Sequence, residues 1–258
     1  MDLSRLALPL ALRRWLAVGR SLRQYYGGGH ERRQRLDRLH ARFVGAGDLA
    51  FDIGSHVGDR IASLRRLGVG VVAVEPQPHL AMTLRLLFGR DPDVEIIAAA
   101  IGASEGTVNL HLNLDNPTVA TASDAFIAAA RGAEGWREQR WEAQIQVPCT
   151  TLDELVARFG LPRFVKIDVE GLEAEVLLGL NHPVQTLSFE FTTIQRRVAL
   201  QALAECERLG GYRYNVALGE SGRLVHARWL DAVAIGTWLE HLPHAANSGD
   251  VYAVRADA

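Results

Sequence analysis

The stretch Asp52-Ile53-Gly54-Ser55-His56-Val57-Gly58-Asp59 decides the fold of this chain. The apolar run 49–53 leads into it and is typical of a short buried strand, whereas residues 58–67 after it predict a helix. A strand that passes through a glycine turn into a helix is typical of a doubly wound α/β sheet, in which ligands bind at the carboxyl ends of the strands. Gly54 and Gly58 allow a tight turn and a close approach of the backbone to a ligand.

Strands and helices alternate along the rest of the chain, which predicts a mostly parallel sheet with helices on both faces. The last two strand candidates have no clear helix between them, so we expect them to form a terminal antiparallel hairpin. An alternating segment in the middle of the chain predicts a β-ribbon. Strands are expected at 69–75, 94–100, 107–114, 145–147, 164–168, 186–191, 212–218 and 251–254, and helices at 80–88, 151–159, 172–178 and 195–209.

The composition favours one soluble domain of ordinary size. The chain has 258 residues, 48% of them hydrophobic, and a formal net charge of −2. Such a charge provides no overall field for nucleic acid or an acidic membrane, and we expect no nucleic-acid partner. Cys149 and Cys206 lie too far apart for metal-ligand spacing and are expected to be buried free thiols in a reducing cytoplasm.

Residues 1–45 differ from the rest of the chain, because they hold ten arginines and only three acidic residues. Two helices are expected there, split by Gly27-Gly28-Gly29, and the first begins near Pro9. The apolar run 6–12 is too short to cross a membrane, and an arginine pair follows it where a signal peptide would have small residues. A helical extension packed on the core and a basic cap over an anionic or lipid-linked substrate are both left open.

We therefore expect a basic N-terminal extension over 1–45 and an α/β domain over 46–258, located in the cytoplasm. Residues 115–144 lack periodicity at first and then carry Trp136 and Trp141, so this stretch is the candidate substrate loop.

The glycine turn excludes two common nucleotide sites. Its two glycines are four residues apart, so the G-x-G-x-x-G pattern of dinucleotide sites is absent, as is the G-K-[ST] of P-loops. Asp52 at its mouth would repel phosphate but attract a cation. Glu75 ends the next strand at about the spacing at which a carboxylate accepts hydrogen bonds from ribose hydroxyls. A nucleoside with a cationic centre fits both residues, and S-adenosylmethionine has this chemistry.

A second group of charged residues closes the fourth strand, Lys166-Ile167-Asp168-Val169-Glu170-Gly171. Lys166 is the only lysine of the chain, and it can hold a neighbouring carboxylate ionised. Asp168 is suited to orient a substrate hydroxyl or the methionyl amine. Glu170 is suited to the same task or to that of a base.

Together these segments resemble the FkbM family of S-adenosylmethionine-dependent methyltransferases. The resemblance covers about residues 48–192 and is most specific in the last segment. The resemblance rests on four segments, in chain order Phe51 to Gly58, Val74-Glu75-Pro76, Thr151-Leu152-Asp153 and Lys166 to Glu173.

The resemblance implies a Rossmann-like sheet of seven strands with a reversed last strand, and methyl transfer to a hydroxyl of a sugar, glycolipid or secondary metabolite. It places the methionyl end at the glycine turn, the ribose at Glu75, and the transferred methyl near Asp168 and Glu170. Ser55-His56 departs from the Ala-Asn that is frequent in the family. The predicted cofactor residues are Asp52, Gly54, Ser55, His56, Gly58, Glu75, Pro76, Ile101 and Asp168.

His56 is the first candidate for the catalytic base, because its loop faces the sulfonium; Glu170 and Glu190 are the alternatives. Asp168 completes the predicted catalytic set. The leading hypothesis includes no metal, but Asp168, Glu170 and Glu190 would also suit Mg²⁺ in a metal-assisted reaction on a diol. A catalytically silent nucleoside- or glycan-binding module is a third possibility. Self-association and peripheral membrane contact through the N-terminal helices are left open.

Overall fold

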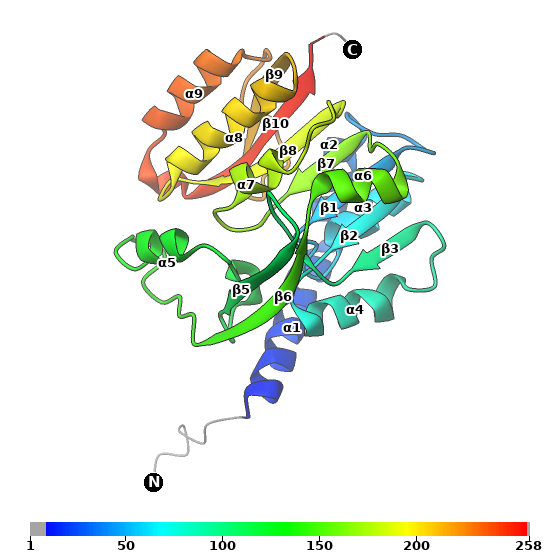
Figure 1. The fold of residues 1–258 in the computed structure, drawn as a ribbon, viewed down its shortest axis with the longest axis vertical. Coiled ribbons are helices and arrows are strands. Elements are labelled where there is room, and N and C mark those ends of the chain that lie inside the picture. The colour runs from blue at the N-terminus through cyan, green and yellow to red at the C-terminus, as the bar shows by residue number, and fades with distance from the viewer. Residues whose placement is uncertain (1–8, 257–258) are drawn as a thin grey trace.

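A computed structural model describes residues 9–256 and places them around a seven-stranded sheet in the order β3-β2-β1-β7-β8-β10-β9 (Figure 1). The pairs among the first five of these strands are parallel, and β10 runs antiparallel to both β8 and β9. The predicted mostly parallel sheet with a reversed last strand is confirmed. The strands are β1 (Leu49–Ile53), β2 (Gly70–Val74), β3 (Val94–Ile97), β7 (Phe164–Ile167), β8 (Thr186–Thr192), β9 (Tyr212–Leu218) and β10 (Ser248–Arg255).

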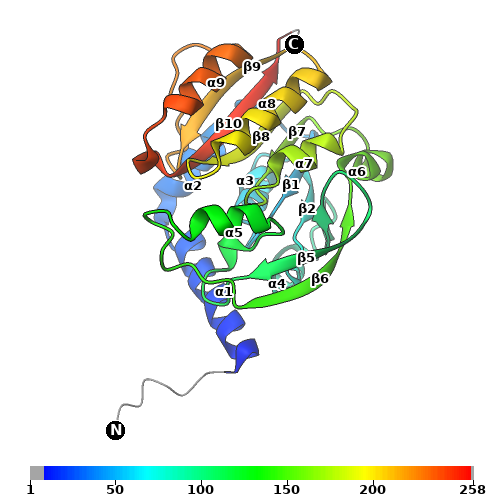
Figure 2. The same ribbon diagram turned by 60° about the vertical axis from the view of Figure 1, so that its left-hand side comes forward.

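Helices cover both faces of the sheet, because side chains along each strand alternate between the two faces. Phe51 and Ile53 of β1 face one helical layer, and Ala50, which precedes them, faces the other. The first layer comprises α6 (Leu152–Phe159), α7 (Glu173–Leu178), α8 (Arg196–Leu209) and α9 (Ala232–His241), and the second α2 (Gly29–His40), α3 (Asp59–Arg66) and α4 (Pro78–Phe88) (Figures 1 and 2).

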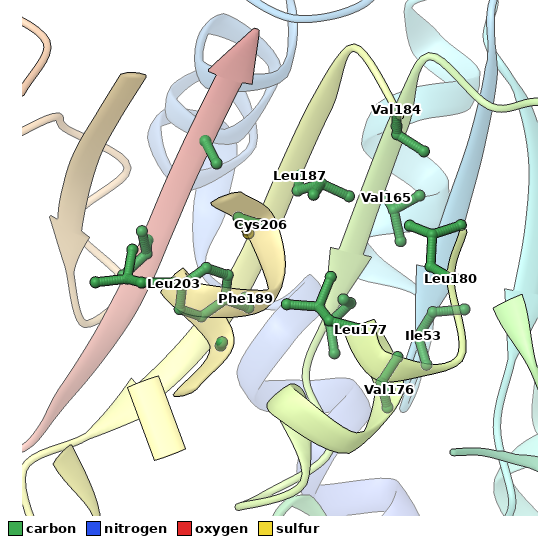
Figure 3. Close-up of a cluster of buried hydrophobic side chains, with 14 of the residues drawn as sticks. Ile53, Val165, Val176, Leu177, Leu180, Val184, Leu187, Phe189, Leu203 and Cys206 are labelled. Atoms are coloured by element: carbon green, nitrogen blue, oxygen red, sulfur yellow. The ribbon is translucent and has the colours of Figure 1, made fainter. Parts of the chain in front are cut away.

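The larger core lies under the first layer. Figure 3 shows Leu177 of α7 and Leu203 of α8 in one cluster with Val165, Leu187 and Phe189 of the strands. Each of these side chains is at most 4% exposed. Burial of such a side chain contributes about 1.5–3 kcal/mol, so this core holds the central strands in a fixed register.

That register brings three strand ends together. Ile53 of β1 lies opposite Val74 of β2 and opposite Ile167 of β7. The next residue of each strand is therefore at the same edge of the sheet. These residues are Gly54, Glu75 and Asp168.

A second, three-stranded sheet packs beside this edge, in the order β4-β6-β5 (Figure 2). The single strand expected at 94–100 is therefore wrong. Its first part is β3 of the large sheet, and the chain then crosses to the small one, where Gly102 N donates to the Thr150 carbonyl. The strands are β4 (Ala100–Ile101), β5 (Gly106–Leu112), which is the expected ribbon, and β6 (Ala143–Thr150), which is longer than expected.

The expected C-terminal hairpin is also wrong. β9 and β10 are antiparallel neighbours, but α9 and a short 3₁₀ turn, η3 (His244–Ala246), lie between them in the chain. Asp231 caps α9 by accepting a hydrogen bond from Ala234 N. Gly236 and several β-branched residues weaken the helical pattern of this segment, which explains why the sequence did not predict it.

Two helices precede the sheet as expected, α1 (Leu10–Tyr26) and then α2, and Pro9 stands just before the first. Val18 of α1 packs on Val57 and Leu80, next to the glycine turn. The apolar positions Leu6 and Leu8 lie outside the described residues. Within residues 9–256 none of the helices has the length and apolar character needed to span a membrane.

Candidate functional site

A cavity of about 740 Å³ opens at the carboxyl ends of β1, β2 and β7, a volume within the range of small-molecule sites. The small sheet forms a second side of the cavity, through Val108 and Leu110. Gln24 and Tyr25 at the end of α1 form a third. The cavity therefore lies where the topology of the large sheet predicts a ligand.

Gly54 forms the floor of the cavity and has no room for a side chain. Its φ is +85°, and an added Cβ would lie 1.9 Å from the Asp168 carbonyl oxygen. Gly58 has a φ of +80°, and a Cβ there would lie 2.5 Å from the Phe88 ring. Both glycines of the turn are thus required by geometry, the first by backbone approach and the second by helix packing.

Glu75 joins the end of β2 to the glycine turn. One carboxylate oxygen accepts a hydrogen bond from His56 N at 2.9 Å, and the other accepts one from Gln77 N at 2.8 Å. The side chain is buried, and burial raises the pKa of Glu75 to about 8. A carboxylate has about four lone pairs, so the Glu75 side chain keeps acceptor capacity for a further donor in the cavity.

His56 lies in the wall of the cavity in a left-handed conformation, with a φ of +49°. Its ring meets the Tyr25 ring edge-on at 5.2 Å between centroids. Burial lowers the pKa of His56 to about 4, so the imidazole is uncharged at neutral pH. Its Nε2 is buried and has no hydrogen-bond partner among the described residues.

Three carboxylates meet in the wall of the same cavity. Asp168 and Glu170 follow β7, and Glu190 lies in the adjacent strand β8. One oxygen of each lies within 4.8 Å of the others. Burial and the neighbouring carboxylates raise the pKa of Glu170 and of Glu190 well above the ordinary value.

Asp168 differs from the other two, because two cations contact its Oδ2 atom. Arg60 approaches at 3.1 Å and Lys166 at 3.3 Å. Burial opposes ionisation here too, but the two cations lower the pKa of Asp168. Lys166 also pairs with Asp250 of β10 at 2.8 Å, which ties the site to the last strand.

Most of the predicted site residues come together in this cavity. The exceptions are Asp52, Ser55 and Gly58, which are not in its wall. Burial raises the pKa of Asp52 to about 6. Ser55 Oγ donates a hydrogen bond to the Asp52 carbonyl at 2.7 Å. These three shape the turn from behind. The wall contains the predicted residues Gly54, His56, Glu75, Pro76, Ile101, Asp168, Glu170 and Glu190.

The candidate loop 115–144 also reaches the cavity and contains η2 (Pro117–Val119) and α5 (Asp124–Ala130). Trp136 lies in the wall, and its indole N–H donates to Asn247 Oδ1 at 3.0 Å. Trp141 is not a wall residue and instead donates to the Val119 carbonyl. Of the two tryptophans, Trp136 alone lies where it could contact an acceptor.

Sequence reasoning missed Arg60, Asp250 and Tyr25. Arg60 stands in the first turn of α3, directly after the predicted turn, and its position was the one available signal. Asp250 enters the site because β10 pairs with β8, where it lies opposite Glu190. Neither that pairing nor the approach of α1 follows from a local pattern.

Comparisons with known proteins agree with this geometry. The model of the methyltransferase FkbM domain matches residues 52–214. The hexuronic acid methyltransferase AglP of Haloferax volcanii is 27% identical over 154 residues, which cover 58% of this chain and 57% of that protein. The chain thus matches little more than half the length of this relative.

Solved structures are similar at a lower level. A precorrin-6y C5,15-methyltransferase from Geobacter metallireducens has a TM-score of 0.44 and 12% identity, covering 87% of each chain. Aeropyrum pernix fibrillarin with bound S-adenosylmethionine has a TM-score of 0.42 and 11% identity, covering 82% of this chain and 68% of that one. Similarity at this level carries no argument about activity.

The family match spans more than half of the sequence, and the chain therefore belongs to the FkbM family of methyltransferases, which take the methyl group from S-adenosylmethionine.

Proposed function

We propose that this protein is an O-methyltransferase that acts on a hydroxyl of a sugar, either free or within a glycolipid or secondary metabolite. The observation that carries the proposal is the meeting of Gly54, Glu75 and the three carboxylates in one cavity of about 740 Å³. The name of the relative, a hexuronic acid methyltransferase, supports a sugar acceptor.

The cavity residues fit S-adenosylmethionine, which supplies an electrophilic methyl group on a sulfonium centre. Glu75 would accept hydrogen bonds from the ribose hydroxyls. The Gly54 backbone at the floor would lie against the methionyl part, while Asp52 behind the turn and Asp168 would attract its positive charges. The Glu170 and Glu190 carboxylates, next to Asp168, then face the acceptor.

His56 is the residue we propose as proton acceptor. Its imidazole is neutral at pH 7, and its buried Nε2 has no partner among the described residues. Bound S-adenosylmethionine would supply the methyl group for in-line transfer to the acceptor oxygen, with S-adenosylhomocysteine as the leaving group, and Nε2 would take the hydroxyl proton. Most of the rate would come from alignment of the reactants, with the base adding about 10²–10⁴-fold. Glu170 and Glu190 remain the alternatives.

The N-terminal helices are proposed to help hold the acceptor. Tyr25 of α1 lies in the cavity wall beside His56, and the first turns of α1 expose Leu10, Leu12 and Trp15. These contacts support a role of residues 1–45 in acceptor binding, and the exposed turns support peripheral contact with a lipid-linked acceptor. The loop role of residues 115–144, self-association and the cytoplasmic location stay predictions.

The test is methyl transfer from labelled S-adenosylmethionine to a neutral hexose, a hexuronic acid and a simple polyol, with product mass read by spectrometry. We expect sugars to gain one methyl group on oxygen. A protein that binds S-adenosylhomocysteine but methylates none of them would be a silent binding module, and a protein that does not bind it would refute the proposal.

The role of His56 is tested by His56→Asn, because asparagine tolerates the left-handed backbone but offers no base. We expect turnover to fall about 10²-fold or more at unchanged affinity for S-adenosylhomocysteine. His79→Asn is the matched control: its pKa is also lowered to about 4 by burial, but it is not in the cavity wall. Near-parental turnover of His56→Asn would assign the proton to a glutamate.

A further inference from the structure

The three carboxylates of the cavity form a compact set of oxygen ligands. Asp168, Glu170 and Glu190 come from neighbouring parallel strand ends, and one oxygen of each lies within 4.8 Å of the others. Opposite oxygens of a six-coordinate Mg²⁺ are about 4.2 Å apart, and those of Ca²⁺ about 4.8 Å. Separations within this limit allow the three oxygens to contact one divalent cation.

Glu170 provides a second and independent observation. Its side chain lies inside the set, the residue is 8% exposed, and its Oε2 has no hydrogen-bond partner within residues 9–256. Glu190 Oε2 is buried without a partner in the same way. Buried polar atoms of folded proteins almost always have a partner, so two such oxygens within one cluster of carboxylates indicate that a ligand binds there.

The charges around the three carboxylates also indicate a bound cation. Lys166 and Arg60 both contact Asp168 Oδ2. Among the ion pairs of the described residues, none includes Glu170 or Glu190. Two carboxylates without a counter-ion beside an ionised aspartate are costly to bury, and a divalent cation would compensate them.

We propose that Asp168, Glu170 and Glu190 bind one divalent cation of the Mg²⁺ class, and that its remaining positions take oxygens of the acceptor. The second half of this statement rests on the proposed sugar O-methyl transfer. Three carboxylates leave about three positions of an octahedral ion open, enough for two neighbouring sugar oxygens and a water. A hydroxyl bound to the ion loses its proton more readily, so a weak base such as His56 suffices.

The ion would also explain how an acidic cavity holds an acidic or hydroxyl-rich acceptor. The same wall contains four further acidic residues, Glu75, Glu175, Glu220 and Asp250. Among the described residues, Arg60 is the one lysine or arginine in this wall, and it already pairs with Asp168. Such a wall repels a free uronate, whereas a bound cation attracts both carboxylate and hydroxyl oxygens.

The experiment titrates Mn²⁺ into the full-length protein after EDTA treatment and dialysis, in the absence of cofactor and acceptor. Calorimetry and the loss of the paramagnetic signal of free Mn²⁺ measure the binding. We expect one Mn²⁺ per chain, competed by Mg²⁺, and at least about tenfold weaker binding for Glu170→Gln and for Glu190→Gln. Glu175→Gln, which removes an exposed carboxylate at the edge of the same cavity, should change the Mn²⁺ affinity less than twofold.

Binding of S-adenosylhomocysteine by each variant verifies that it is folded. No binding at millimolar Mn²⁺, or equal binding by the parent and both glutamine variants, overturns the cation site and means that the carboxyls hold protons instead. Undiminished methyl transfer in EDTA overturns the acceptor role of the ion but leaves the proposed O-methyl transfer standing. Site-specific Mn²⁺ binding without transfer to any sugar supports the ion and refutes the proposed function.

Discussion

At the scale of single residues, Glu75 shows how the fold prepares a polar group for a ligand. Two backbone N–H groups hold its oxygens in place, and burial raises its pKa to about 8. Below that pH the free carboxyl is protonated, and its O–H group competes with hydroxyl donors from a ribose. Cofactor binding must therefore displace a proton from Glu75 in neutral solution.

We predict that the affinity for S-adenosylhomocysteine rises with pH between about 5 and 8. The bound state favours the carboxylate, so each pH unit below a pKa of about 8 weakens binding, at most about tenfold. Glu75→Gln binds more weakly at pH 8 and has a flatter profile, because its amide does not titrate. Calorimetry of both proteins checks this, and the difference between their profiles removes the titration of the ligand itself. Parallel profiles would contradict the role of Glu75.

The residues of the site could be predicted in part. Glu75 and Asp168 were predictable because a parallel sheet gathers its strand ends at one edge, so their chain order alone placed them together. The pKa shifts of these two residues could not be predicted, because burial and the contact of Arg60 with Asp168 depend on packing. Asp250 could not be found, because it comes from a strand whose neighbours no local pattern specifies.

At the scale of elements, the N-terminal helices are joined to the methyltransferase domain by specific contacts. Arg32 of α2 pairs with Asp59 at 3.0 Å and with Glu220 at 2.9 Å. Its guanidinium also lies over the Tyr25 ring, 4.8 Å from the centroid. Asp59 is 7% exposed and begins α3, so this arginine connects both helices to the glycine turn.

We predict that Arg32→Met lowers the free energy of unfolding by about 2–4 kcal/mol, because it leaves the Asp59 carboxylate buried without its cation. Arg35→Met on the same helix is the control: Arg35 makes an exposed pair with Glu31 at 3.7 Å, and its loss should change stability by less than about 0.5 kcal/mol. Urea denaturation measures both. Equal effects of the two substitutions would show that α2 is held by apolar packing alone.

The elements that the sequence predicted well are those with strong local patterns. β1, β2 and β7 are short apolar runs bounded by glycine or proline, and α8 is a long amphipathic helix. α9 was missed because its glycine and β-branched residues obscure the helical period, although Asp231 gave a capping signal. The division of 94–101 between two sheets was missed because it depends on the partners of a strand rather than on its own residues.

At the scale of the whole molecule, the order of the strands differs from their order in the chain. β10 follows the other six strands of the sheet in the chain, yet it lies between β8 and β9 and pairs with both along its length. Val251 in its centre is fully buried and faces Phe189 on one side and Val216 on the other. The integrity of this half of the sheet therefore depends on the final strand.

We predict that Val251→Pro destabilises the fold by about 3 kcal/mol or more beyond Val251→Ala, because proline removes a ladder N–H from a central strand. Val251→Ala retains the N–H group and should cost about 2 kcal/mol for the lost side-chain burial. Thermal unfolding followed by circular dichroism compares the two. Similar melting temperatures would mean that β10 is dispensable for the fold.

The position of β10 also has a consequence for how the protein is made. On the ribosome, β8 and β9 emerge before the strand that separates them, so for that interval β8 has one edge with unpaired backbone groups. Such an edge can pair with another nascent chain. We therefore expect fast translation to favour aggregation of this protein, and a chaperone that shields β8 until β10 emerges to raise the soluble yield.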